Sequence, residues 1–368
     1  MLSVLLLMLL WVIAAFLVLS TLLPLSKVPF GAIRGLDFPR EQYFLIAAGL
    51  AILVFFFHPG WLGGFGTLFF VALAAVQLVY IAKFTPIWWR QSVNASTDLH
   101  ANTDRQVSLL AANIKKSNRD YAALIRMVQQ REPDILMAIE VDADWITALK
   151  KGLGEQFEHW VEAPKDNGYG LCVMSKLPLS GPQVRELITK DVPSVRTEVR
   201  LRCGDMFRLY VVHPEPPVVN HDTKGRDSEI AMIGLEATKD DLPAVVAGDL
   251  NDVAWSTTTR RFQRLSGLLD PRVGRGFYNT FSATMPWLRW PLDHLFHDAR
   301  FRLIEMARLN KIGSDHFPMW FVLALANTEA EESSPGASDT SERVETKKMI
   351  VQERERDRGP IGADWEDE

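Results

Sequence analysis

The sequence predicts an α/β protein in which sheets with helices on their outside follow a membrane anchor of three helices. Three long apolar runs come before any amphipathic segment. Strand-like and helix-like patterns then alternate, with strands outnumbering helices. The last part is rich in Glu, Ser, Lys and Arg and poor in apolar residues. We therefore expect an anchor over 1–92, an α/β domain over 104–326 and a disordered acidic tail over 327–368, in which a fraying helix can form around 347–356.

The anchor is predicted to cross the bilayer at about 2–25, 43–62 and 65–84, because each run can form a helix of about 20 apolar residues. No Lys or Arg precedes the first run and no convincing cleavage site follows it, so we expect a retained helix instead of a signal peptide. Trp61, Trp88 and Trp89 suit an interfacial aromatic belt. Burial of these helices in a soluble core is the less favoured alternative.

The basic residues around the apolar runs bear on orientation. Lys27, Arg34 and Arg40 lie between the first and second runs, none lies between the second and third, and Lys83 and Arg90 follow the third. The positive-inside rule places the first loop and the domain on the cytoplasmic side. Five charges give this rule little weight.

Composition limits the classes of function. The net charge is -5, and the tail holds 13 acidic and 6 basic residues, so the rest of the chain is close to neutral. A neutral body lacks the basic surface that grips a nucleic-acid backbone. Cys172 and Cys203 lack metal-ligand spacing, and because both follow strand-like patterns we expect buried free thiols.

The domain is expected to contain the following elements in order. Strands are predicted over QVSLLAANI, ILMAIEV, GLCVMSK, the two halves of SVRTEVRLRCGDMFRLYVVH, AVVAGDLND, LDHLF and FPMWFVLAL. Helices are predicted over RDYAALIRMVQQREPD, with Tyr121, Leu124, Ile125 and Val128 on one face, and over SEIAMIGLEATKDD.

Polar residues interrupt the ends of these apolar runs. They are Asn113, Glu140, His213, Asp249, Asn251, Asp293, Asp315 and His316. Any one of them alone fits a surface turn. Together they predict a site at the rim of a sheet, where a rigid scaffold presents functional loops.

The acidic members suit a hard metal ion. Glu140 and Asp315 offer carboxylate oxygens for Mg²⁺ or Mn²⁺, and no Cys/His cluster supports a softer metal. Asp249 is suited to take a proton from an attacking water, and Asn251 to orient that water or a phosphate oxygen.

The imidazoles suit a phosphoryl group. His213 and His316 can donate hydrogen bonds to charge that develops in the transition state, and Asp293 can fix the tautomer of a histidine. No Ser or Cys nucleophile with an adjacent base is evident. The residues therefore favour metal-assisted attack of water at phosphorus.

The motifs resemble those of the endonuclease/exonuclease/phosphatase superfamily. AANIKKSN, PDILMAIE, VVHPEPP, AGDLND, RWPLDHLF and GSDHFP appear in its order across roughly 106–325. The resemblance implies a DNase I-like four-layer α/β/β/α sandwich. It also implies roles at the matching positions: Asn113 and Asp315 near the metal, Glu140 as the principal Mg²⁺ ligand, His213 and His316 on the phosphate, Asp249 and Asn251 on the water, and Asp293 supporting the last histidine.

Two departures bear on the substrate. HPEPP lacks the Tyr of abasic-site DNA endonucleases, and no long basic loops interleave with aromatics, so a nucleic-acid substrate is not favoured. The three spans resemble a membrane-anchored bacterial branch of the superfamily. That branch implies multi-pass insertion in the plasma (inner) membrane, a domain facing outward and lipid-linked phosphates or pyrophosphates as substrates. We follow it over the charge count and expect the extracytoplasmic side.

Several alternatives stay open. A nuclease is the second enzymatic candidate, and a catalytically inactive, membrane-bound interaction protein is the candidate from another class. The oligomeric state is not predicted. MPWLRWP (285–291) suits either contact with the bilayer or core packing. Arg196, in the middle of a predicted strand, suits either contact with a phosphate or a cross-strand charge pair. Loop arginines that can clamp a phosphate, although solvated by default, are Arg226, Arg272, Arg275 and Arg289.

Overall fold

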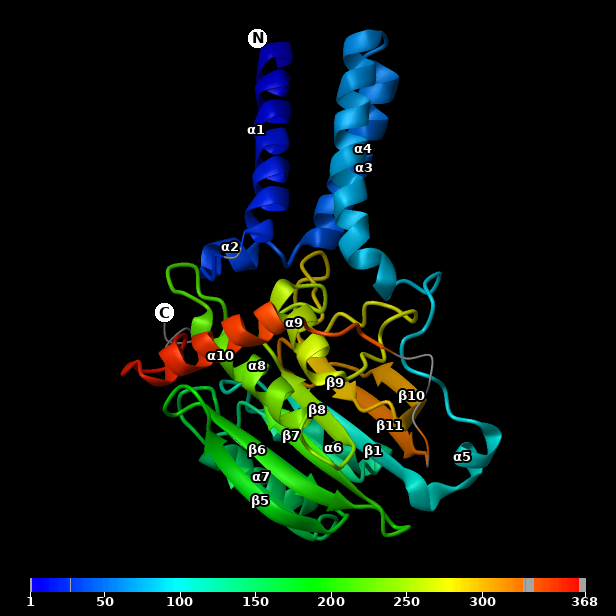
Figure 1. The fold of residues 1–368 in the computed structure, drawn as a ribbon, viewed down its shortest axis with the longest axis vertical. Coiled ribbons are helices and arrows are strands. Elements are labelled where there is room, and N and C mark those ends of the chain that lie inside the picture. Colours follow the sequence, from blue (N-terminus) through cyan, green and yellow to red (C-terminus); the bar gives the residue numbers. More distant parts are fainter. Residues whose placement is uncertain (1, 27, 327, 329–333, 364–368) are drawn as a thin grey trace.

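The domain is a sandwich of two facing sheets with helices on both outer faces, and three long helices stand above it (Figure 1). The computed structural model describes residues 2–26, 28–326, 328 and 334–363; Lys27, one of the charges used for orientation, lies outside them. This arrangement confirms the predicted four-layer α/β/β/α class.

The first sheet has six strands in the order β10-β11-β1-β2-β4-β3. Their bounds are β1 Gln106–Asn113, β2 Ile135–Ile139, β3 His159–Ala163, β4 Leu171–Ser175, β10 Phe301–Arg308 and β11 Met319–Leu325. β1 and β2 are parallel, whereas the other pairs are antiparallel.

The second sheet has five strands in the order β5-β6-β7-β8-β9. Their bounds are β5 Leu179–Glu186, β6 Pro193–Arg200, β7 Met206–Val212, β8 Ala244–Asp249 and β9 Asp293–His297. Here only β7 and β8 are parallel. Each sheet thus has one parallel pair at its centre, and the carboxyl ends of such a pair meet at one edge.

Alternation along the strands builds the layers. Leu109 of β1 and Leu209 of β7 belong to the core between the sheets, whereas Leu110 and Tyr210 point to the outer faces. The outer face of the first sheet is covered by α6 (Tyr121–Arg131) and α7 (Ala143–Leu153), and that of the second by α8 (Lys224–Ala237) and α9 (Thr257–Ser266).

The cysteines differ in burial. Cys172 is buried in β4, as expected, but Cys203 is exposed, so that prediction was wrong. The turn between β6 and β7 carries it, and a turn at the end of a hairpin has only one side to pack against.

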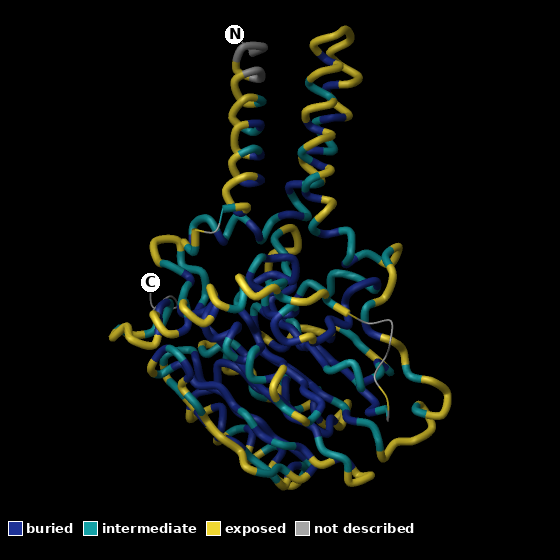
Figure 2. Tube along the Cα trace, in the orientation of Figure 1, coloured by how far each residue is buried: buried dark blue, intermediate teal, exposed yellow. Residues whose placement is uncertain are grey.

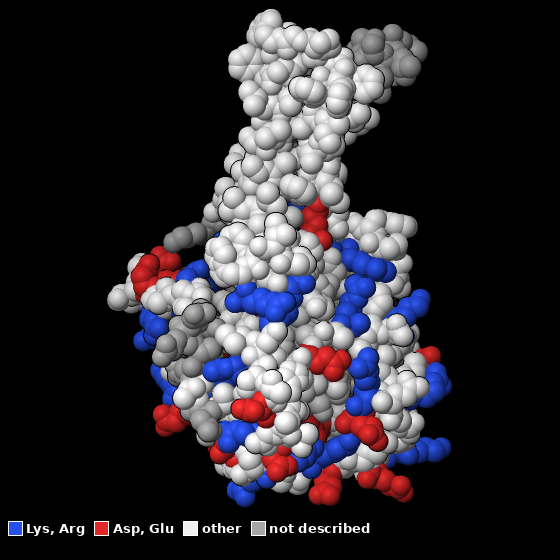
Figure 3. Space-filling view, turned by 90° about the vertical axis from the view of Figure 1, so that its right-hand side faces the viewer, with Lys and Arg blue, Asp and Glu red and all other residues white. Residues whose placement is uncertain are grey.

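The anchor consists of α1 (Leu2–Leu22), α3 (Arg40–Phe57) and α4 (Trp61–Ile81). Three stretches are long and apolar enough to cross a membrane: Met8–Leu25, Arg40–Phe57 and Trp61–Phe84. Their outward faces are exposed (Figure 2), and the stalk is uncharged on the side seen in Figure 3. The second helix ends at Phe57, before the predicted position 62, and the third begins at Trp61, before the predicted position 65. Pro59 and Gly60, which has a positive φ of 104°, separate the two helices.

The anchor is packed directly onto the domain. Arg40 donates through Nε to Asp37 Oδ1 (2.9 Å) and through Nη1 to Gln77 Oε1 (2.9 Å). Trp255 of the domain donates to the backbone oxygen of Asp37 (2.7 Å), and its ring meets Phe84. The short helices α2 (Gly31–Gly35) and α5 (Thr97–Ala101), with one-turn 3₁₀ helices at Leu23–Leu25, Ala82–Phe84 and Thr103–Arg105, complete the connections.

The tail forms a docked helix over much of its length. The disorder predicted for 327–368 is contradicted by α10 (Thr340–Arg354), although 327, 329–333 and 364–368 lie outside the described residues. Ile350 packs with Ala231 and Leu265, and Glu342 accepts from Arg264 Nε (2.9 Å). Some of the charges that suggested disorder, such as Glu342 and Arg358, thus form ion pairs with the domain.

Candidate active site

Four of the polar residues predicted to converge come from the two central parallel pairs. Asn113 ends β1, Glu140 follows β2, His213 follows β7 and Asp249 ends β8. Glu140 has φ 67°, a left-handed backbone that costs about 1–3 kcal/mol for a residue with a side chain. Such strain is typical of positions where a side chain is aimed at a functional site.

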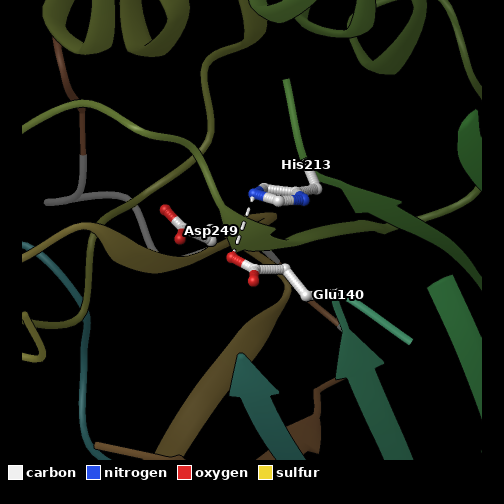
Figure 4. A group of neighbouring side chains, drawn as sticks. All are labelled: Glu140, His213 and Asp249. Carbon is white, nitrogen blue, oxygen red and sulfur yellow. Dashed lines mark ion pairs between the residues drawn. The ribbon is translucent and has the colours of Figure 1, made fainter. Parts of the chain in front are cut away.

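Glu140 and Asp249 are joined through one amide. Nδ2 of Asn113 donates to Glu140 Oε1 (2.7 Å) and to Asp249 Oδ2 (3.0 Å). Lys116 donates its backbone N–H to Glu140 Oε2 (3.1 Å). Figure 4 shows Glu140, His213 and Asp249 around one space at the strand ends. The central expectation, that residues far apart in sequence meet here, holds for these carboxylates.

His213 lies between Glu140 and Asn251. Its Nε2 is 3.9 Å from Glu140 Oε1 and 3.2 Å from Asn251 Nδ2. Burial lowers the pKa of His213 to about 4, so the imidazole is neutral at pH 7 and its Nε2 accepts from the amide of Asn251. The contact with Glu140 is therefore not an ion pair at that pH.

His316 forms the opposite side. Its Nδ1 donates to Asp293 Oδ2 (2.7 Å), and its Nε2 is 3.5 Å from Asp249 Oδ2. Burial alone would lower the pKa of His316, but the carboxylates of Asp293 and Asp249 outweigh it and raise the pKa to about 10. His316 is thus an imidazolium held between two acids.

The two central carboxyls differ in charge state. Burial raises the pKa of Glu140 to about 7, against the hydrogen bond from Asn113. Burial also acts on Asp249, but the charge of His316 and the backbone N–H of Asn251 hold its pKa below the usual value. Burial removes water from the Glu140 carboxylate, and its neighbours do not supply a full positive charge. A bound cation would supply that missing charge.

Two groups of described residues can hold a metal ion: Glu140, His213 and Asp249, and Asp249, Asp293 and His316. Hard carboxylate oxygens with one neutral imidazole fit a divalent cation. Of the predicted metal ligands, Glu140 belongs to the first group. Asn113 instead turns its NH₂ towards the carboxylates, and its Oδ1 accepts from the backbone of Lys115 (3.0 Å).

Asp315 lies outside both groups. Its Oδ2 is 3.1 Å from Nζ of Lys115, an ion pair that AANIKKSN did not suggest. The carboxylate nevertheless lies close enough to raise the pKa of Glu140.

The arginine candidates are mostly engaged by the protein. Arg226 is buried, pairs with Asp227 and donates Nη1 to the backbone oxygen of Asn251 (2.9 Å). Arg272 is buried with Asp270 (2.8 Å). Arg226 and Arg272 are therefore held by protein groups, and they stabilise the segments next to the site.

The walls of the pocket come from three parts of the chain. A cavity of about 240 Å³ above the cluster is lined by Phe38 of the anchor, Tyr169 and Phe281 of the domain and Gly362 of the tail. The hydroxyl of Tyr169 donates to the backbone oxygen of Ile361. Sequence reasoning missed these residues, because no polar motif marks them.

The tail is fastened at this wall by a buried acid. Arg358 donates Nη2 to Glu215 Oε2 (2.7 Å), and the backbone N–H of Ile361 donates to Glu215 Oε1 (2.8 Å). Glu215 follows His213 by two residues in HPEPP. The acid at the centre of this motif therefore holds the C-terminal segment.

A buried acid-histidine cluster at the edge of a DNase I-like sandwich defines a hydrolase of phosphoric esters. The chain belongs to the endonuclease/exonuclease/phosphatase family, whose profile matches residues 99–316. Enzymes of this family generally depend on a divalent metal, which suits the acid-histidine groups.

Solved structures similar to this chain were also found. TDP2 of D. rerio complexed with single strand DNA product is 17% identical over 59% of this chain and 98% of that one, with a TM-score of 0.49. A family protein of Beutenbergia cavernae is 17% identical over 60% and 72%, with a TM-score of 0.49. Mannosyl-6-phosphatase of Bacteroides thetaiotaomicron is 17% identical over 60% and 100%, with a TM-score of 0.46. The curated proteins include no match.

Gly248 sets the spacing of the strands that carry His213 and Asp249. Its φ is 144°, and a Cβ there would lie 1.9 Å from the backbone oxygen of Val212. We expect Gly248→Ala to lower stability by about 2–4 kcal/mol, from overpacking together with a disfavoured backbone. Gly267→Ala is the control, because Gly267 also has a positive φ (75°) but a Cβ there would meet open space. Its loss of stability should come only from the disfavoured backbone conformation. Equal melting temperatures of the two variants in detergent would contradict this.

Glu229 of α8 should make stability pH-dependent. It is buried, its Oε1 has no hydrogen-bond partner among the described residues, and burial together with Glu215 raises its pKa from 4.5 to about 8. Between those pH values the folded state holds a proton that the unfolded state has lost, so stability falls as pH rises through this window. Glu229→Gln should therefore raise the melting temperature at pH 8.5 and change it little at pH 4. A gain of the same size at both would refute the assignment.

Proposed function

We propose that the protein is a membrane-tethered, Mg²⁺- or Mn²⁺-dependent phosphohydrolase that cleaves a phosphoester or pyrophosphate of a lipid-linked substrate. One observation carries the proposal: the acid-histidine cluster lies at the floor of a pocket whose wall includes Phe38, from the segment between two candidate spans. The resemblance to the membrane-anchored branch supports multi-pass insertion in the plasma membrane with an extracytoplasmic domain.

The pocket suits an amphiphilic molecule. Its floor holds Glu140, Asp249 and His316, whereas its rim is formed largely by apolar side chains such as Phe38 and Leu292. A phosphoryl head at the floor would leave an apolar chain beside the anchor. Tethering keeps the site at the bilayer and raises the effective concentration of a substrate confined there.

The chain's residues would act as follows. Glu140 would hold the cation, with Asp249 and His213 next to it, and Asn113 would orient the carboxylates. Asp315 stays a candidate for indirect contact, because Lys115 occupies its Oδ2. A bound divalent ion supplies Lewis-acid polarisation of a phosphoryl oxygen.

Proton transfer falls to the remaining residues. Ionised Asp249 would accept a proton from water positioned by Asn251. Imidazolium His316, oriented by Asp293, would donate to a phosphoryl oxygen as its charge grows. Neutral His213, whose Nδ1 has no partner among the described residues, would hydrogen-bond the leaving oxygen.

A substrate panel on the full-length protein tests the proposal. Polyprenyl phosphates and pyrophosphates, phosphatidic acid, and single- and double-stranded DNA and RNA would each be assayed with Mg²⁺ and with chelator, in wild type and Glu140→Gln. We expect Mg²⁺- and Glu140-dependent phosphate release from lipids. Glu140-dependent cleavage of nucleic acid alone would establish the nuclease instead. Identical backgrounds throughout would favour an inactive interaction protein.

Orientation needs a separate experiment. A reporter fused after Arg90 would be active only on its permissive side of the membrane. We expect the extracytoplasmic reporter to be active, and activity of the cytoplasmic reporter alone would reverse the assignment.

A further inference from the structure

A second hollow lies where the anchor meets the domain. This boundary groove, of about 990 Å³, is lined by Gln42, Leu45 and Ile46 of α3, by Trp287 and Arg289 of the loop before β9, and by Arg308 at the end of β10. It shares no lining residue with the active-site pocket. The groove is therefore a separate feature of the molecule.

The groove holds two arginines that have no acidic partner among the described residues. The guanidinium carbons of Arg289 and Arg308 lie 5.0 and 4.5 Å from the ring centroid of Phe317. Their only hydrogen bonds within the described chain are to the backbone, from Arg289 Nε to Ser282 O (3.1 Å) and from Arg308 Nη1 to Asn279 O (2.7 Å). Two like charges that share one ring, with donors left over, form a site for an anion.

The one acid of the described lining does not neutralise them. Glu41 accepts from Nδ2 of Asn279 (3.0 Å) and forms no ion pair among the described residues. Burial and the charge of Arg289 lower the pKa of Arg308, as expected where no carboxylate offsets the repulsion. The groove thus keeps a net positive charge.

The other half of the groove is apolar and faces outward. Leu45 is 67% exposed and Trp287 is 70% exposed. Leu45 lies in the second turn of α3, whose span begins at Arg40, so it is at the level where headgroups meet hydrocarbon. Figure 3 shows Lys and Arg side chains on this side of the domain, just below the uncharged stalk. A ligand here meets cations on one side and lipid on the other.

We propose that the boundary groove binds the headgroup of an anionic phospholipid from the surrounding bilayer. Arg289 and Arg308 hold the phosphate, and Leu45 and Trp287 contact the upper part of the acyl chains. Free phosphate would use only the cationic half. This inference rests on the membrane insertion in the proposed function but not on catalysis.

Native mass spectrometry of the full-length protein in detergent, with added phosphatidylglycerol or phosphatidylcholine, tests the groove. Wild type should retain phosphatidylglycerol over phosphatidylcholine. Arg289→Ala/Arg308→Ala should lose this retention by about tenfold or more, since both guanidinium groups that hydrogen-bond the phosphate are removed. Gln42→Lys adds a cation at the rim of the groove and removes no backbone contact of either arginine. This variant should increase the retention of phosphatidylglycerol.

The control is Arg126→Ala/Arg200→Ala. Both residues are exposed, and Arg200 pairs with Met206 at the start of β7, the end of the sheet opposite His213. It should retain lipid like wild type. Equal retention by wild type and Arg289→Ala/Arg308→Ala would overturn the proposal, as would displacement of the lipid by millimolar inorganic phosphate. Glu140→Gln should lose turnover but keep the lipid, so failure of the groove and failure of the hydrolase proposal are distinguishable.

Discussion

Asp249→Asn is expected to lower kcat by about 10²–10⁴-fold, the contribution of a general base. The ionised carboxylate is the group proposed to take the proton from water, and an amide cannot accept it. Folding should be preserved, because the new Oδ1 can still accept the backbone N–H of Asn251, 2.8 Å away in wild type, although the hydrogen bond from Asn113 Nδ2 to Oδ2 is lost. Single-turnover phosphate release from the lipid substrate measures the change.

Asp144→Asn is the matched control for this variant. Asp144 is exposed in the first turn of α7, so the same loss of charge leaves the site untouched. Its kcat should equal that of wild type. Near-normal turnover by Asp249→Asn at an unchanged melting temperature would show that another group is the base.

His316→Gln is expected to lower kcat by about 10²–10³-fold, the usual cost of removing one transition-state donor. A second effect distinguishes this role from a purely structural one. The charge of His316 holds the pKa of Asp249 down, so its removal should raise that pKa. Because Asp249 must be ionised to act, the acid limb of the pH–rate profile should move to higher pH.

His159→Gln, at the start of the edge strand β3, is the control for the loss of an imidazole. It should leave both kcat and the pH profile unchanged. If His316→Gln lowers kcat while its acid limb stays in place, the coupling between His316 and Asp249 is wrong.

Much of the fold and the centre of the site could be predicted from the sequence. The strand β8 is a short apolar run that ends in Asp249, and β11 is one that follows the pair Asp315 and His316. The carboxyl ends of parallel strands meet by geometry. The strand β5 was missed, because Gly181 and Pro182 interrupt its pattern at a register shift, and β3 and β10 were also not foreseen. Asp293 and His316 were predicted as partners and lie 2.7 Å apart.

Other parts depend on tertiary contacts that local pattern does not encode. Nothing in the anchor sequence indicates that Phe38 lines the pocket. The tail is ordered by acids and arginines that meet partners on α9 and in HPEPP, such as Arg358 with Glu215. Of the two Trp residues in MPWLRWP, Trp287 is exposed, as bilayer contact requires, whereas Trp290 stacks on Phe281. Core packing thus applies to Trp290, whereas bilayer contact stays a prediction for Trp287.

The most direct test of the cation site formed by Glu140, His213 and Asp249 is Mn²⁺ binding to the full-length protein in detergent, measured by electron paramagnetic resonance. Wild type and Glu155→Gln, a control at an exposed acid after α7, should bind Mn²⁺ with equal affinity. Glu140→Gln should bind it about 10–100-fold more weakly, a loss at least as large as removal of a supporting residue causes at metal sites. Equal binding by all three proteins, or none by wild type, would contradict a metal centre built on Glu140.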